Sequence, residues 1–86
     1  MDVKDKVLAF FRPKIKPSGK DENEFLNIEY MDEGIIDSME IVTMIVEFEK
    51  TFGIHFSAED MQSREFRNIG GLIGIIEQLM RNKKNA

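Results

Sequence analysis

Hydrophobic residues recur at three- and four-residue spacing in three parts of the chain. This spacing places them along one face of a helix and predicts three amphipathic helices. They run from Asp2 to Arg12, from Asp37-Ser38 to Phe52, and from Ile69 toward the charged end of the chain. The last helix is expected to fray, so we predict a single domain over residues 1–82 and a frayed tail at 83–86.

The middle helix carries clear signals at both of its ends. Asp37 and Ser38 are favoured N-cap residues, and Glu40 stands three positions after Asp37, where the acidic member of a capping box is found. Gly53 follows Phe52 and predicts a C-terminal stop in the left-handed conformation. Apolar positions at spacings of three, three and four predict one buried stripe along this helix, made of Val42, Ile45, Phe48 and Phe52.

The other segments are predicted to be connectors and short helical turns. The run from Pro13 to Glu24 contains two prolines and many charges, which predicts a long surface loop. The apolar residues after it, Tyr30 among them, are expected to pin a connector with a short helical turn against the core. SAEDM is expected to form a capped turn, and Ser63 to cap a short helix of sequence REFRN. Without a credible strand pair, these elements predict a compact all-α bundle.

Composition and charge limit the possible functions. The formal net charge of -4 is unfavourable for binding nucleic acid. The chain has no cysteine and a single histidine, His55, so a thiol nucleophile and a Cys/His metal cluster are excluded and a reducing compartment is favoured. No apolar run has the length of a membrane span or the form of a signal peptide. We therefore expect a cytoplasmic protein that does not insert into a membrane.

Catalysis by the chain itself is not indicated. A nucleophilic serine needs a base beside it, whereas His55 lies seventeen residues after Ser38 and beyond the predicted helix. Adjacent carboxylates such as Glu59-Asp60 are interpreted as solvated charge, because acid-base work requires burial. We predict neither enzymatic activity nor a metal site.

A calcium loop is the alternative to weigh at the same place. The segment from Glu29 to Glu40 has the length of an EF-hand loop, with Gly34 at its sixth position and Glu40 at its twelfth. Met31 at the third position cannot coordinate a hard cation, and Glu29 replaces the shorter aspartate of the first position. We interpret this partial match as coincidence.

The turn GIIDSM at residues 34–39 resembles the acyl carrier protein family, whose hallmark is a Gly-x-x-Asp-Ser-(Leu or Met) turn that opens the second helix. The resemblance continues in a Phe-Gly-Ile-x-(apolar) exit at residues 52–56, followed by Glu59-Asp60, a short helix and a last helix. It covers most of the chain. It implies a four-helix acyl-carrier-type bundle with three main helices, one short third helix and a long first loop.

The resemblance also implies a cofactor and partners. The serine of the motif, here Ser38, would carry 4'-phosphopantetheine from coenzyme A through a phosphodiester, with Asp37 in a supporting role. The terminal thiol would hold an acyl or aminoacyl group as a thioester. A phosphopantetheinyl transferase, a loading ligase and acyl-processing enzymes are the implied partners of a monomer. The start of a helix suits this role, because its unpaired N–H groups and positive dipole end favour an anionic phosphodiester.

Two further sets of residues are assigned on the same basis. Partner enzymes are expected to contact Met39, Glu40, Thr43, Met44 and Glu47. The core, part of which would shelter an acyl chain, is expected to include Val42, Ile45, Phe48, Ile54 and Phe56, with Met39 beside them.

The branch of the family is left open by the sequence. Thr43 and Lys50 make the exposed side of the middle helix less acidic than is typical of carriers in fatty acid biosynthesis. The turn and the stretch MQSREFRN look closer to D-alanyl carriers and to carriers of specialised pathways. Aminoacyl, short acyl and polyketide-type cargoes all fit. The alternative function is an unmodified helical interaction module that binds a partner through the apolar residues around Met39 to Met44.

Overall fold

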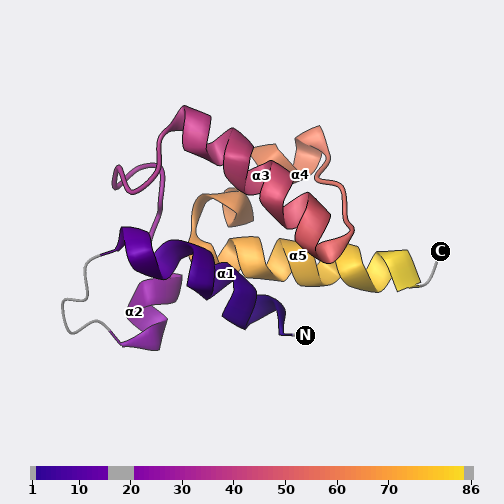
Figure 1. The fold of residues 1–86 in the computed structure, drawn as a ribbon, viewed down its shortest axis with the longest axis horizontal. Helices are drawn as coiled ribbons and strands as arrows, with labels where there is room; N and C mark the ends of the chain where they lie inside the picture. Colours follow the sequence, from indigo (N-terminus) through magenta and orange to yellow (C-terminus); the bar gives the residue numbers. More distant parts are fainter. Residues whose placement is uncertain (1, 16–20, 85–86) are drawn as a thin grey trace.

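The computed structural model describes residues 2–15 and 21–84. Every regular element in these two ranges is a helix, which confirms the predicted all-α class. The elements, with η for a 3-10 turn, are α1 (Val3–Phe11), η1 (Arg12–Lys14), α2 (Glu22–Leu26), α3 (Ser38–Phe52), α4 (Ala58–Gln62), η2 (Arg64–Arg67) and α5 (Ile69–Lys84). In Figure 1, α5 lies along the long axis, with α3 on one side of it and α2 on the other.

Helix α1 follows from its own sequence. The Asp2 carboxylate accepts a hydrogen bond from the Lys4 backbone N–H at 3.0 Å and caps the helix. The apolar face places Val7 and Phe11 in the core, and Pro13 stands in η1 directly after the helix. Both predicted ends of this helix are therefore confirmed to within one residue. Part of the loop that was predicted from Pro13 to Glu24, residues 16–20, lies outside the described residues.

The rotation of α3 about its axis differs from the prediction. Its buried residues are Met44, Phe48 and Phe52, whereas Val42 is 60% exposed. The Phe48 ring packs edge to face against Phe10 of α1, with 5.3 Å between ring centroids. The expected burial of Val42 is therefore wrong. The helix carries two apolar stripes, and the one that contains Met44 is buried.

The segment between α3 and α5 also corrects one prediction. Ser57 caps α4, as expected for a capped turn at SAEDM, through a reciprocal capping box with Asp60. Ser63 does not cap the next turn with its side chain; its hydroxyl instead donates to the Asp60 carbonyl at 2.7 Å. The expected short helix is a single 3-10 turn, η2, whose Phe66 is buried as an anchor.

Helix α5 is the longest element. It runs from Ile69 to Lys84, and residues 85–86 of the expected tail lie outside the described range. A side chain at Gly71 would collide with the backbone of Glu65, which explains how η2 lies so close to α5. Among the residues that the structure describes, no helix combines the length and apolar character needed to span a bilayer.

Candidate functional site

The turn before α3 is closed by backbone hydrogen bonds that converge on Tyr30. Its carbonyl accepts from the N–H groups of Ile35 and Ile36, at 2.9 and 3.2 Å. Gly34 makes the reversal possible with a φ of 72°, a left-handed conformation that favours glycine. The result is that Ile36 enters the core and Asp37, the next residue, is exposed at the surface.

Tyr30 connects this turn to η2, a segment that is distant in sequence. Its side chain is fully buried, its ring packs on Phe11 with 5.1 Å between centroids, and its hydroxyl donates to the backbone carbonyl of Phe66 in η2. Burial raises the pKa of Tyr30 above its usual range, because the phenolate would lose its hydration. The neutral hydroxyl therefore holds the turn against η2. Sequence analysis treated Tyr30 as an apolar anchor and missed this bond.

The first turn of α3 is held by a reciprocal capping box. The Asp37 carboxylate accepts from the Glu40 N–H at 2.9 Å, and the Glu40 carboxylate accepts from the Asp37 N–H at 3.3 Å. The Glu40 carboxylate also lies 3.4 Å from the Lys14 ammonium of η1. The predicted cap is confirmed, and Asp37 performs it. Ser38 is therefore the first residue within the helix rather than its cap.

Ser38 presents a free hydroxyl at the start of this helix. Its side chain is exposed, and no residue of the described ranges hydrogen-bonds to its hydroxyl. The hydroxyls of Ser57 and Ser63, by contrast, are both engaged. The N–H groups of Ser38 and Met39 also have no partner among the described residues, as is usual in the first turn of a helix. A nucleophilic oxygen thus lies beside two donors and the positive end of a 15-residue helix.

Two of the cavities lined by described residues, of about 370 and 410 Å³, are each large enough for a small organic group. The one beside α3 measures about 410 Å³ and is lined by Met31, Asp32, Ile41, Ile45, Met61, Phe66 and Arg67. Ile41 and Ile45 follow Ser38 by three and seven residues, so they share its face of the helix. This cavity is therefore the one that extends from the Ser38 side of α3.

The expected pocket residues are distributed differently. Ile45 lines this cavity and Ile54 is half-buried, whereas Phe48 and Phe56 are closed within the core. Val42 points away from the core, and it lines neither the core nor the cavity beside α3. The cavity residues that sequence analysis missed come from four separate segments of the chain, so no local pattern marks them.

The expected partner-binding residues are mostly at the surface. Met39 is 78% exposed, so it does not line the core beside which it was placed, and Thr43 and Glu47 are exposed as well. Glu40 is half-buried in the capping box. Met44 is fully buried, so its assignment to a contact surface is wrong; it lies on the core stripe of α3. Sequence analysis missed Val46, which is 46% exposed.

Among the described residues, neither a histidine base for catalysis nor a calcium site is assembled near Ser38. The His55 imidazole lies 3.2 Å from the Glu49 carboxylate, which also accepts from the Phe56 N–H at 2.9 Å. In the supposed calcium loop, the Glu33 carboxylate accepts from the Glu29 N–H at 3.0 Å. Across residues 2–15 and 21–84, no three His, Cys, Asp or Glu side chains gather closely enough to hold a metal ion.

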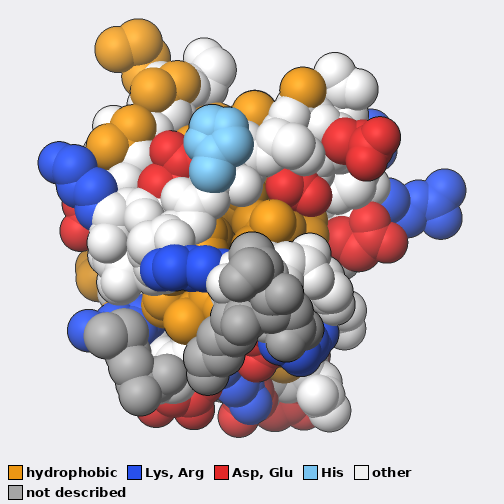
Figure 2. All heavy atoms as spheres, turned by 90° about the vertical axis from the view of Figure 1, so that its right-hand side faces the viewer, with side chains coloured by type: hydrophobic (Ala, Val, Ile, Leu, Met, Phe, Trp, Pro, Cys, Tyr) orange, Lys and Arg blue, Asp and Glu red, His pale blue; other side chains and the backbone are white. Residues whose placement is uncertain are grey.

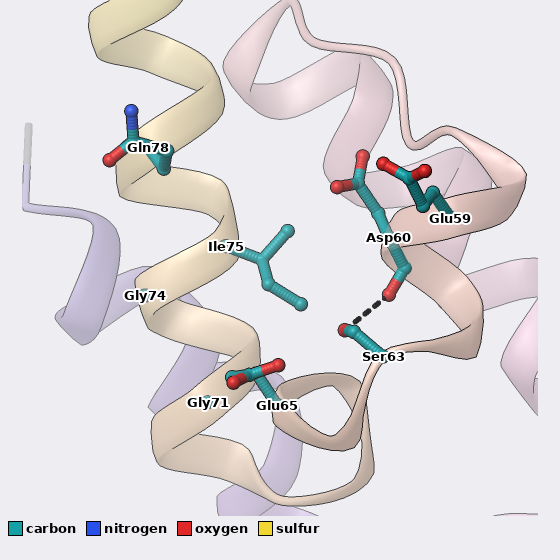
Figure 3. A pocket seen from close by; sticks show the side chains of 8 residues that line it. All are labelled: Glu59, Asp60, Ser63, Glu65, Gly71, Gly74, Ile75 and Gln78. Atoms are coloured by element: carbon teal, nitrogen blue, oxygen red, sulfur yellow. Dashed lines mark hydrogen bonds between the residues drawn. The ribbon is translucent and has the colours of Figure 1, made fainter.

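The second cavity, of about 370 Å³, lies between α5 and the segment of α4 and η2, as Figure 3 shows. Three of its lining residues, Glu59, Asp60 and Glu65, are acidic, and Gly71 and Gly74 form part of its wall. The Asp60 carboxylate is engaged with the Ser57 N–H at 2.9 Å. Ser38 is not part of this cavity.

Comparison with known protein families gives one result that bears on the site. The family model described as phosphopantetheine attachment site matches residues 19–76, more than half of the chain. The match includes the Gly34 turn, all of α3 and the segment through η2. It confirms the resemblance inferred from GIIDSM. No curated protein matches the chain by sequence.

Proposed function

Because the chain belongs to the phosphopantetheine attachment site family, we propose that Ser38 is the residue to which the phosphopantetheine arm is attached. Proteins of this family are carriers and not enzymes, their prosthetic group is 4'-phosphopantetheine, and a phosphopantetheinyl transferase modifies them. The group supplies a terminal thiol that holds its cargo as a thioester. The attachment point within this chain is the step that the proposal adds.

The observation that carries the proposal is the free hydroxyl of Ser38. The Asp37 carboxylate caps α3, so the Ser38 hydroxyl is not needed for stability. It is exposed and can attack the pantetheine-bearing phosphorus of the coenzyme A pyrophosphate. The new bond from the Ser38 oxygen to phosphorus replaces the P–O–P bond, so a phosphodiester forms and 3',5'-ADP leaves. The transferase must take up the proton, since the one histidine of the chain, His55, pairs with Glu49.

The surroundings of Ser38 fit an attached phosphodiester. The unpartnered N–H groups of Ser38 and Met39 can donate to its oxygens, and the positive end of α3 favours its negative charge. Asp37 keeps these donors in place because its carboxylate fixes the first turn through the Glu40 N–H. In this proposal Asp37 supports the site by positioning it.

We further propose that the cargo is an acyl or aminoacyl group and that the cavity beside α3 shelters it. The cavity follows the face of α3 that carries Ser38, Ile41 and Ile45, and most of its lining is apolar. A loading ligase and acyl-processing enzymes would then deliver and use the group. Fatty acid biosynthesis and specialised pathways are both compatible with a cavity of this kind.

Mass spectrometry of the intact protein tests the attachment. The unmodified protein is incubated with coenzyme A and a broad-specificity phosphopantetheinyl transferase, and each molecule should gain one arm. Ser38→Ala should gain none, while the matched variants Ser57→Ala and Ser63→Ala should gain one arm as the wild type does. A wild type that stays unmodified, or a Ser38→Ala variant that gains the arm equally, contradicts the proposal.

The alternative, an unmodified interaction module, is supported by the exposed apolar residues on α3. Met39, Val42 and Val46 are large side chains that a soluble surface does not need. This alternative predicts partner binding that is equally tight for the wild type and for Ser38→Ala. A carrier, in contrast, can no longer hold or deliver a thioester-linked group when Ser38 is replaced by alanine.

A further inference from the structure

The outer face of α3, which consists of Met39, Val42, Thr43, Val46, Glu47 and Lys50, is strongly apolar for an exposed helix face. Its three large apolar side chains, Met39, Val42 and Val46, follow one another at spacings of three and four residues. They form a stripe roughly 10 Å long, given the rise of an α-helix. Figure 2 shows hydrophobic side chains protruding along the upper side of the molecule, where α3 and α4 lie in Figure 1.

The outer face carries almost no net charge. Glu47 and Lys50, its two charged residues, have opposite signs. The other two carboxylates of α3 are already engaged. Glu40 completes the capping box and pairs with Lys14, while Glu49 accepts from the Phe56 N–H and pairs with His55. On the outer face itself, a basic patch of a partner would therefore meet one available carboxylate, Glu47, with a lysine close to it.

An enzyme that reacts with Ser38 through an interface of ordinary size also covers this stripe. Met39 directly follows Ser38, and Val46 lies about 12 Å from Ser38 along the helix axis. A specific protein interface removes about 800 Å² of surface from each partner. A patch of that area centred near Ser38 extends far enough along α3 to include Val46. The transferase that modifies this family is therefore the occupant to consider, since it has to bring coenzyme A to the Ser38 hydroxyl.

We propose that the phosphopantetheinyl transferase docks on the outer face of α3 through apolar contacts with Met39, Val42 and Val46, and not through a basic patch that pairs with carboxylates. This inference rests on attachment at Ser38. Burial of the stripe supplies the binding energy, because large apolar side chains contribute in proportion to the area removed from water. Charge contributes little, since Glu47 and Lys50 largely cancel each other's field.

The test is the KM of the unmodified protein in the transferase reaction. Val42→Asp should raise KM about tenfold or more, because it places a charge in the apolar contact. The direction of the change in KM distinguishes the two docking modes. An added carboxylate would lower KM if a basic patch were the partner surface, whereas it should raise KM if the contact is apolar. Val46→Asp should act in the same direction, and the nearly isosteric Val42→Thr should have a smaller effect.

Asn82→Asp is the matched control. It adds the same charge to an exposed position near the end of α5, far from the start of α3 in Figure 1, and its side chain still accepts from Gln78. Its KM should stay within about twofold of the wild type. Raising the salt concentration from about 0.05 to about 0.5 M should change the wild-type KM less than about threefold, because apolar contacts are not screened.

The outcomes are distinguishable. The docking inference is overturned if Val42→Asp and Val46→Asp leave KM unchanged or lower it, or if salt raises the wild-type KM tenfold while Ser38 is still modified. Thermal unfolding of each variant excludes loss of the fold as the cause of a raised KM, and Val42→Thr serves if either aspartate variant unfolds. If the wild type gains no arm at all, the attachment at Ser38 fails, and the docking inference fails with it.

Discussion

Ser38 and Ser57 both stand at the beginning of a helix that is closed by a capping box, but their hydroxyls have different roles. Ser57 is itself the cap of α4, and its hydroxyl accepts from the Asp60 N–H at 3.0 Å. At α3 the cap is Asp37, and Ser38 is the residue after it. An offset of one residue therefore leaves one hydroxyl engaged in structure and the other available for chemistry.

The two helix starts also differ in what surrounds them. The 15-residue α3 has a longer array of aligned peptide dipoles than the 5-residue α4. The turn before α3 is held by the buried Tyr30, whereas the loop before α4 is held by the bond from the Phe56 N–H to Glu49. The same capping device serves stability at α4, while at α3 it also fixes the position of Ser38, the proposed attachment point.

The largest expected difference between the two serines is in modification. Ser38→Ala should abolish attachment of the arm completely. Its free energy of unfolding should stay within about 0.5 kcal/mol of the wild type, because the hydroxyl makes no contact that the fold needs. Intact mass and urea unfolding of the same preparation measure both effects. A clearly destabilised Ser38→Ala would mean that the hydroxyl also has a structural role.

Tyr30→Phe tests the anchor of the α3 turn. It leaves the buried carbonyl of Phe66 without its donor, and we expect a loss of about 1 to 3 kcal/mol in the free energy of unfolding. Unfolding by heat or urea measures the loss. A change below 0.5 kcal/mol would indicate that the bond from Tyr30 to η2 does not hold the turn.

The same tyrosine predicts a dependence on alkaline pH. Its pKa is raised in the folded protein, so above pH 10 the unfolded chain releases this proton more readily than the native one. The free energy of unfolding should therefore fall as pH rises above 10, by at most about 1.4 kcal/mol per pH unit from this residue. Tyr30→Phe is the control, since it should remove this contribution and leave the rest of the pH dependence unchanged. Equal slopes for both proteins would contradict the prediction.

Asp37→Ala should remove the cap that leaves Ser38 free. We expect a loss of about 1 to 2 kcal/mol, because the Glu40 N–H loses its acceptor. Modification should become slower but not cease. Asp37→Asn keeps an acceptor of similar shape and should recover most of the stability. If both variants were equally unstable, the charge of Asp37 rather than its hydrogen bond would be the stabilising factor.

Ser57→Ala should cause the smallest of these losses in the free energy of unfolding. The loss of its cap should cost about 0.5 to 1 kcal/mol, at the low end for caps because α4 has five residues. Attachment of the arm should proceed at the wild-type rate, since Ser57 belongs to a different helix. A slowed attachment would show that the two helix starts are coupled.

The sequence by itself determined both ends of α1 and of α3, and it singled out Ser38 as the proposed attachment point. Caps act between groups about three residues apart, as in the bond from the Glu40 N–H to Asp37, and Gly53 ends α3 through its own left-handed conformation. Such local chemistry can be read along the chain. The GIIDSM turn is equally local, so Ser38 could be proposed as the attachment point without knowledge of the packing.

The tertiary structure decided which side of α3 is buried and what Tyr30 binds. Two apolar stripes on α3 satisfy the same helical period, and only in the folded protein is the one that contains Met44 buried while Val42 is exposed. The acceptor of the Tyr30 hydroxyl lies 36 residues away, at Phe66. These choices depend on residues distant in sequence, and periodicity carries no information about such partners. For that reason Val42 and Val46 are recognised as surface residues beside Ser38 only in the folded protein.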